Sequence, residues 1–180
     1  PWTIITYMFT HENLLHILIN MCYLYFGGQI FMSYLSGKEL LSTYIMGGIM
    51  GAFVYIAAFN TFPVFENIQA NSLAIGASAS VFSILLAAAT YVPDYPLNLP
   101  IIKKIKLKHI AIIAVIIDIL SIPNGNSGGH LAHLGGALYG YIYIKMRHQG
   151  INTGYFVDQI LLLFYKQKKN SAYKRHENDY

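Results

Sequence analysis

The sequence contains little charge and almost no cysteine. Asp, Glu, Lys and Arg make up 11% of its 180 residues, whereas a typical soluble domain carries roughly 25%. A single cysteine, Cys22, excludes a disulfide scaffold. Apolar residues amount to 55%, which excludes an intrinsically disordered chain. The net charge of +4 is modest, so we expect no nucleic-acid partner. These properties indicate an integral membrane protein.

Long stretches of the chain carry no charged side chain at all. A helix needs about 20 apolar residues to cross the hydrocarbon core of a bilayer. The uncharged stretches have 25 to 27 residues each and are 13–37, 40–65, 67–93 and 119–144. None shows the regular polar face of an amphipathic helix. We therefore predict an all-α, polytopic membrane helix bundle, with five spans at about 14–34, 40–60, 76–92, 108–122 and 130–147.

The basic residues predict how this bundle is oriented. All 12 Lys and Arg lie between the first and second spans, from the third span's end to the first residue of the fourth span, or from the end of the fifth span onward. The segments 1–13, 61–75 and 123–129 carry none. Under the positive-inside rule, the basic side and the C-terminus face the cytoplasm. A bacterial inner membrane is the expected location, and the lack of a second cysteine fits it.

Two of the predicted spans are short. The third begins at the small-residue stretch 75–80, which leaves about 16 helical residues before Pro93. A helix too short to cross must begin inside the membrane, where non-helical backbone is tolerated only beside a wet, protein-lined cavity. Interrupted spans of this kind indicate a functional site. The fourth span is also short and carries an acid, Asp118.

Four polar side chains within the predicted spans supply the parts needed for acyl transfer. Ser78 lies in the first turn of a helix, where free backbone N–H groups favour developing negative charge. A histidine such as His133 can take the hydroxyl proton and make the serine a nucleophile. His16 and Asn20 are four residues apart and share a helix face. With the N–H of Ser78, they can donate hydrogen bonds to an oxyanion.

Three motifs in this sequence resemble those of the rhomboid family of intramembrane serine proteases. The family's H-x-x-x-x-H-x-x-x-N motif matches residues 11–20, which run from His11 through His16 to Asn20. Its G-x-S-G motif matches Gly76-Ala77-Ser78-Ala79. Its A-H-x-x-G-x-x-x-G motif matches residues 132–140, which contain His133. The motifs follow in the family's order, and the resemblance covers roughly residues 1–148.

The resemblance implies a protease that cuts peptide bonds in or near the transmembrane segments of other membrane proteins, without cofactor or metal. Ser78 would be the nucleophile and His133 the base, as a dyad with no acid. The oxyanion donors would be His16, Asn20 and the Ser78 N–H. Supporting roles fall to Gly76, Phe82, Gly136 and Gly140: Phe82 would lie against His133, and the last two glycines would dock the sixth family helix on the fourth. The family has six helices and five are predicted here, so the family's first helix is either truncated from this segment or absent from the protein.

Other interpretations of these residues remain open. Ala79 replaces the second glycine of G-x-S-G and could shift the dyad. Ser80 competes as nucleophile but lies two residues from the motif. His11 and His130 are expected to be loop or structural residues. Asp118 is expected to have a structural role, in which it accepts hydrogen bonds from tyrosine or backbone groups or is protonated. A zinc site formed by the histidines is disfavoured because no cysteine or carboxylate stands at ligand spacing.

Two other functions compete with proteolysis. The chain would otherwise be an inactive rhomboid-like protein that binds transmembrane clients, or a small transporter relaying protons through Asp118 and histidines. The predicted domains are a transmembrane core, 1–148, and a cytoplasmic tail, 149–180, with a possible interfacial helix at 151–165. The sequence leaves the substrate and the oligomeric state undetermined.

Overall fold

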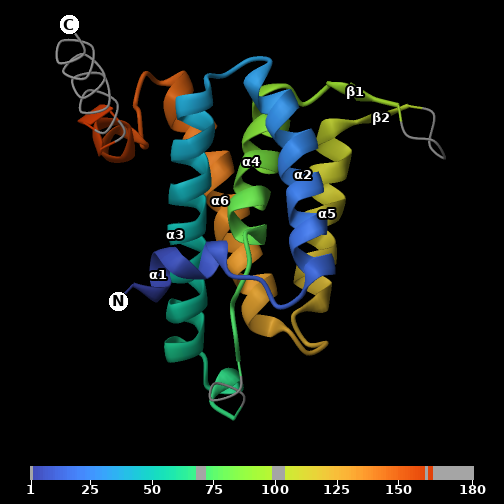
Figure 1. Ribbon diagram of the computed structural model, residues 1–180. Helices are drawn as coiled ribbons and strands as arrows, with labels where there is room; N and C mark the ends of the chain where they lie inside the picture. Colours follow the sequence, from blue (N-terminus) through green and yellow to red (C-terminus); the bar gives the residue numbers. More distant parts are fainter. Residues whose placement is uncertain (1, 68–71, 99–103, 161, 164–180) are drawn as a thin grey trace, which may run out of the picture.

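The computed structural model describes residues 2–67, 72–98, 104–160 and 162–163 as a bundle of helices (Figure 1). Five long helices occupy the predicted ranges, and the only β-structure in the described residues is a two-stranded ribbon. The helices are α1 (Thr3–Thr6), η1 (Tyr7–Phe9), α2 (Leu14–Met32), α3 (Gly37–Thr61), η2 (Pro63–Phe65), α4 (Ser78–Tyr91), α5 (Leu107–Ser121) and α6 (Ser127–His148). The ribbon pairs β1 (Pro96–Leu97) with β2 (Ile105–Lys106).

Side-chain caps define where three of the long helices begin. The carboxamide of Asn13 accepts a hydrogen bond from the His16 N–H (2.9 Å) at the start of α2. Ser36 and Glu39 form a reciprocal capping box at the start of α3. Asn126 accepts a hydrogen bond from the Gly129 N–H at the start of α6. These bonds satisfy backbone donors that have no partner inside the helix.

The short helix α4 is the centre of the bundle. It packs against α2, α3, α5 and α6, and its buried positions are mainly alanine and serine. Figure 1 shows that α4 begins part-way along the bundle, after the non-helical segment 72–77. That this helix begins inside the membrane, as the sequence analysis expects, stays a prediction.

Two glycines bring the backbones of α4 and α6 into direct contact. A Cβ atom added at Gly136 would overlap the carbonyl oxygen of Ala79, and one added at Gly140 would overlap the carbonyl oxygen of Ser83. Both residues are buried in α6. In the structure, α6 docks on α4 through Gly136 and Gly140, as the sequence analysis expects.

The methyl group of Ala79 points toward α3 and away from α6. A Cβ atom added at Gly51 of α3 would lie 2.7 Å from the Cβ atom of Ala79, while the backbone of Ala79 faces Gly136. Gly51 therefore leaves the space that the extra methyl occupies. The alanine that departs from the G-x-S-G motif does not push α4 away from α6.

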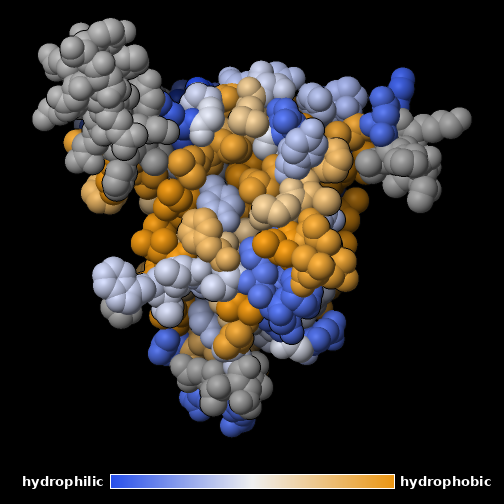
Figure 2. Space-filling model, in the orientation of Figure 1, coloured by the Kyte–Doolittle hydropathy of each residue, from blue (hydrophilic) through white to orange (hydrophobic). Residues whose placement is uncertain are grey.

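The outer surface of the bundle is apolar. α2 exposes Leu14 (73%) and Phe26 (66%), and α5 exposes Ile117 (56%) and Leu120 (68%). In Figure 2 the hydrophobic side chains gather over the middle of the molecule, and hydrophilic ones lie mostly toward its ends. Large contiguous apolar surfaces of this kind mark contact with a membrane or a partner.

Among the described helices, α2 and α3 are long and apolar enough to cross a bilayer, and α4 is apolar but shorter. The count of five spans stays a prediction.

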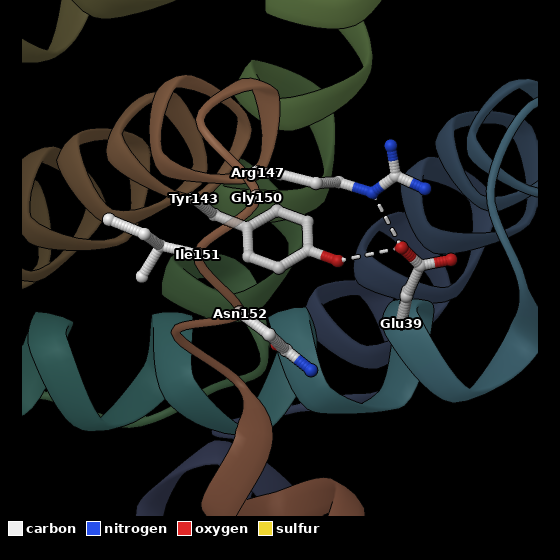
Figure 3. A pocket seen from close by; sticks show the side chains of 6 residues that line it. All are labelled: Glu39, Tyr143, Arg147, Gly150, Ile151 and Asn152. Atoms are coloured by element: carbon white, nitrogen blue, oxygen red, sulfur yellow. Dashed lines mark hydrogen bonds and ion pairs between the residues drawn. The ribbon is translucent and has the colours of Figure 1, made fainter.

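Charged side chains gather where α3 begins and α6 ends. The guanidinium of Arg147 donates to Glu39 (2.7 Å), and the Tyr143 hydroxyl donates to the same carboxylate oxygen (3.2 Å). Figure 3 shows these side chains around a pocket of about 260 Å³, which is also lined by Gly150, Ile151 and Asn152. This pocket lies near the C-terminal end of α6, far along that helix from His133.

An ion-pair cluster fixes the ribbon to the start of α5. Asp94 pairs with Lys108 (2.8 Å) and Lys106 (3.0 Å). Hydrogen bonds from Lys108 and Lys106 lower the pKa of Asp94 to about 2, so this carboxylate stays charged at neutral pH.

Beyond α6 the chain turns back toward the bundle. The hydroxyl groups of Tyr139 and Thr153 are hydrogen-bonded (3.2 Å), and residues 155–160 and 162–163 are helical. Tyr155 and Phe156 are exposed while Val157 is buried. The predicted interfacial helix 151–165 ends outside the described residues, and the division of the chain at 148/149 stays a prediction.

We expect Gly136→Val to destabilise the protein, because its side chain would force α6 away from the backbone of α4. Overpacking of this kind costs about 1–3 kcal/mol, which thermal unfolding in detergent would measure. Gly37→Ala is the matched control, since a Cβ atom at Gly37 meets nothing within 4 Å. Equal unfolding temperatures for Gly136→Val and wild type would contradict the close contact.

Candidate active site

Ser78 and His133 meet at the contact between α4 and α6. Ser78 is the first residue of α4, and His133 lies in the second turn of α6. Their atoms Oγ and Nε2 are 2.6 Å apart, a short hydrogen-bond distance. Phe82, one turn after Ser78, stacks on the His133 ring with centroids 4.8 Å apart and planes 16° apart. The structure therefore brings together the three residues that the motifs place at this point.

A carboxylate lies on the other side of the His133 ring. Asp118 Oδ1 is 3.0 Å from His133 Nδ1 and 2.6 Å from His130 Nδ1. Asp118 is only 4% exposed. The sequence analysis expected a serine–histidine pair without an acid, and the structure differs because α5 packs Asp118 against the first two turns of α6.

The shared carboxylate defines where the histidine protons are. An ionised carboxylate only accepts hydrogen bonds, so both Nδ1 atoms act as donors to Oδ1. A neutral His133 with its proton on Nδ1 has a lone pair on Nε2. That lone pair faces Ser78 Oγ, so the serine hydroxyl donates to Nε2.

Gly76 allows His16 to approach the serine. Its φ angle is +118°, a conformation that residues with a side chain rarely adopt. A Cβ atom at Gly76 would also lie 2.8 Å from the Cε1 and Nε2 atoms of His16. The N–H of Gly76 donates to the carbonyl oxygen of Tyr7 (3.0 Å), which fixes this turn to the N-terminal segment. Gly76 therefore allows both the backbone turn into α4 and the close approach of the His16 ring.

The other predicted oxyanion residue makes a different contact. The carboxamide of Asn20 donates to the carbonyl oxygen of His16 (3.0 Å), and Asn20 is 4% exposed. In this arrangement Asn20 holds the turn of α2 that carries His16. A role for Asn20 in binding an oxyanion stays a prediction.

For two residues near Ser78, His11 and Ser80, the sequence analysis predicts a structural role and a competing nucleophile role, respectively. His11 accepts a hydrogen bond from the Ala77 N–H (3.4 Å) and meets the His16 ring edge-on, with centroids 5.2 Å apart. The hydroxyl of Ser80 lies 3.8 Å from Met8 Sδ and is fully buried. Ser80 therefore faces the N-terminal segment, whereas Ser78 faces His133.

Asp118, His130 and His133 also form a set that can ligate a metal ion, with ligand atoms all within 4.8 Å of one another. Two ligands of one tetrahedral zinc ion, each about 2.0–2.1 Å from it, would lie about 3.3 Å apart. The observed separations from Asp118 Oδ1, 2.6 and 3.0 Å, are shorter. Protons on the two Nδ1 atoms account for these distances without an ion.

The arrangement has the parts of a nucleophilic site that the protein covers only in part. Ser78, His133 and His16 are all half-buried. A hydroxyl hydrogen-bonded to an oriented imidazole can attack a carbonyl carbon. Sequence reasoning identified this pair, but it left Asp118 without a partner. The available signal was that Asp118 is an ionisable residue inside a span, and its partners are 12 and 15 residues away on another helix.

Comparison with known proteins agrees with the motifs. The rhomboid domain matches residues 1–150. The zebrafish presenilin-associated rhomboid-like protein A, mitochondrial, is 29% identical over 145 residues, which are 78% of this chain and 36% of that protein. The RHOMBOID-like protein 12, mitochondrial, of Arabidopsis thaliana is 31% identical over 144 residues, 75% of this chain and 43% of that protein. The human presenilin-associated rhomboid-like protein, mitochondrial, is 26% identical over 145 residues.

The chain spans well under half the length of these relatives. No significant match to a solved structure was found. The relatives are named as mitochondrial proteins, so the expected bacterial inner membrane has no support. With the rhomboid domain matched over residues 1–150, the chain belongs to the rhomboid family of integral membrane proteins.

Proposed function

We propose that this protein is an intramembrane serine protease that hydrolyses peptide bonds in or near the transmembrane segments of other membrane proteins. The observation that carries the proposal is the 2.6 Å contact between Ser78 Oγ and His133 Nε2. Both residues stand at the family's motif positions. They lie in a bundle whose outer surface is apolar. Such a surface fits a protease whose substrates are membrane proteins and does not fit a soluble protease.

The proposed reaction follows from the direction of that hydrogen bond. Ser78 Oγ bonds to the carbonyl carbon of the scissile peptide while its proton passes to His133 Nε2. The imidazolium then gives this proton to the amide nitrogen as the C–N bond breaks and the amine product leaves. Water attacks the remaining ester, His133 takes the proton of that water, and the acid product leaves as Ser78 recovers its hydrogen.

Donors for the oxyanion are already gathered near Ser78. The backbone N–H of Ser78 lies in the first turn of α4, where N–H groups have no partner within the helix. The His16 ring is held beside Gly76, and the edge of His11 supports it. Preorganised donors of this kind stabilise charge that develops in the transition state. We assign this role to the Ser78 N–H and His16, with Asn20 as a further donor that would have to leave the His16 carbonyl.

The helix directions suggest how the protein lies in the membrane. Ser78 and His133 stand near the starts of α4 and α6, toward the end of the bundle that carries no Lys or Arg. We infer five crossings in this chain, with the basic end on the positive-inside face. Substrates would enter from the lipid as transmembrane segments with a weakened helix near the scissile bond, because a helix keeps its own carbonyl groups hydrogen-bonded.

Ser78→Ala and His133→Ala should each abolish cleavage of a model single-span substrate by the full-length protein in proteoliposomes. The first removes the nucleophile and the second removes the base. Ser80→Ala is the matched control and should keep near wild-type activity, because Ser80 faces Met8. Cleavage by wild type that persists in Ser78→Ala would contradict the proposal. A failure of wild type to cut while it still binds the substrate would favour a client-binding protein.

His16→Ala should lower kcat and leave KM nearly unchanged, because an oxyanion donor acts mainly in the transition state. Removal of one such donor typically costs about 10²–10³ in kcat. Steady-state kinetics in detergent would separate the two parameters. His109→Ala, which changes an exposed histidine of α5, should match wild type. A KM effect alone for His16→Ala would assign His16 to substrate binding instead.

A further inference from the structure

We propose that Asp118 is a positioning residue of the site: its carboxylate holds His133 in the tautomer that accepts the Ser78 proton and balances the charge of the imidazolium that forms. This inference rests on the proposed protease function. It turns the expected serine–histidine pair into a serine–histidine–aspartate arrangement contributed by three helices, α4, α6 and α5.

The position of Asp118 on its helix supports the inference. The buried residues of α5 are Leu107, Ala111 and Asp118, which fall on one face at helical spacing. The flanking residues Ile117 and Ile119 are 56% and 51% exposed. Asp118 is therefore the one ionisable residue on the buried stripe of α5, and the other two, Lys108 and His109, lie in its first turn. Ionisable residues in such places are costly and are usually paired for a function.

The partners of the carboxylate are two histidines of α6. Asp118 Oδ1 accepts from His130 Nδ1 (2.6 Å) and from His133 Nδ1 (3.0 Å), and the two rings meet edge-on with centroids 5.9 Å apart. Within the described residues, Oδ2 is buried and has no hydrogen-bond partner. The carboxylate is therefore held by the two imidazole N–H groups alone, and both act on the same oxygen.

Charged groups elsewhere around α5 do not compete for this carboxylate. α6 brings His130 and His133, and α4 brings Ser78, which reaches Asp118 only through His133. Among the described residues, the basic side chains near β2 and the start of α5 are Lys104, Lys106 and Lys108, at the other end of the helix from Asp118. Lys106 and Lys108 pair there with Asp94. Among the described residues, the two histidines are thus the groups that hold this carboxylate.

The carboxylate of Asp118 affects the transfer of the Ser78 proton to His133 and the positive charge that this transfer creates on the ring. When the Ser78 proton passes to His133 Nε2, the ring carries protons on both nitrogens and one positive charge. Asp118 stays ionised and faces that charge through the Nδ1–H. The imidazolium therefore forms beside a preorganised negative group, as in serine proteases that carry an acid. His130, as the second donor, keeps Oδ1 directed at α6 and is a supporting residue.

The test is Asp118→Asn in the full-length protein, assayed with a model single-span substrate in proteoliposomes. Asparagine keeps the shape and removes the charge, so kcat should fall by at least about tenfold, toward the roughly 10⁴-fold known when the acid of such an arrangement becomes asparagine. KM should stay within about twofold. The pH below which kcat/KM declines should move to lower pH, because the imidazolium loses its counter-charge. Asp118→Ala should show the same pattern.

Two controls separate positioning from a structural role. Asp158→Asn makes the same chemical change at a carboxylate that pairs with Asn152 outside the site, and it should leave kcat unchanged. Thermal unfolding in detergent measures the folded fraction of each variant. The inference is overturned if Asp118→Asn and Asp118→Ala retain the wild-type kcat and pH profile, or if their loss of activity equals their loss of folded protein.

Wild type and Ser78→Ala in the same assay distinguish this failure from failure of the proposed function. If wild type cleaves, Ser78→Ala does not, and Asp118→Asn matches wild type, only the role of Asp118 is lost. If wild type does not cleave, or Ser78→Ala cleaves equally, the protease function and the role of Asp118 fall together.

Discussion

The close approach of two helix backbones is the constraint on which the site depends. Gly136 and Gly140 of α6 have no side chains, so α6 lies directly against the carbonyl groups of Ala79 and Ser83 in α4. That contact begins one residue after Ser78 and one turn after His133. The 2.6 Å separation of Ser78 Oγ and His133 Nε2 is therefore a consequence of backbone packing. α3 completes this constraint, because Gly51 leaves the space that the methyl of Ala79 occupies.

Burial and hydrogen bonding around this contact specify one protonation pattern. Phe82 stacks on the His133 ring, and Asp118 accepts from its Nδ1. The remaining nitrogen faces the serine. Near Ser78, the positive φ angle and the missing side chain of Gly76 let the His16 ring come close. His133 and His16 are thus brought to the region of Ser78 by different helices, and all three side chains are half-buried.

Much of this could be predicted from the sequence, because the signals are local. The four charge-free stretches predicted the positions of α2, α3, α4 and α6, whereas α5 carries Lys108 and Asp118. The motifs identified Ser78 and His133 as partners. Asp118 could not be paired, since helical spacing relates residues within one helix and Asp118 reaches α6 from α5. The bond from Asn20 to the His16 carbonyl and the direction of the Ala79 methyl depend on rotation about helix axes, which residue types do not report. The expected bacterial membrane rested on composition alone and found no support.

The account's central claim is that this bundle activates Ser78. Covalent labelling with a fluorophosphonate, followed by mass-spectrometric mapping in the full-length protein in proteoliposomes, tests it without any choice of substrate. The account predicts a single adduct on Ser78 that forms much more slowly in His133→Ala. No adduct in the folded protein, or labelling of another serine such as Ser80 in place of Ser78, would contradict it.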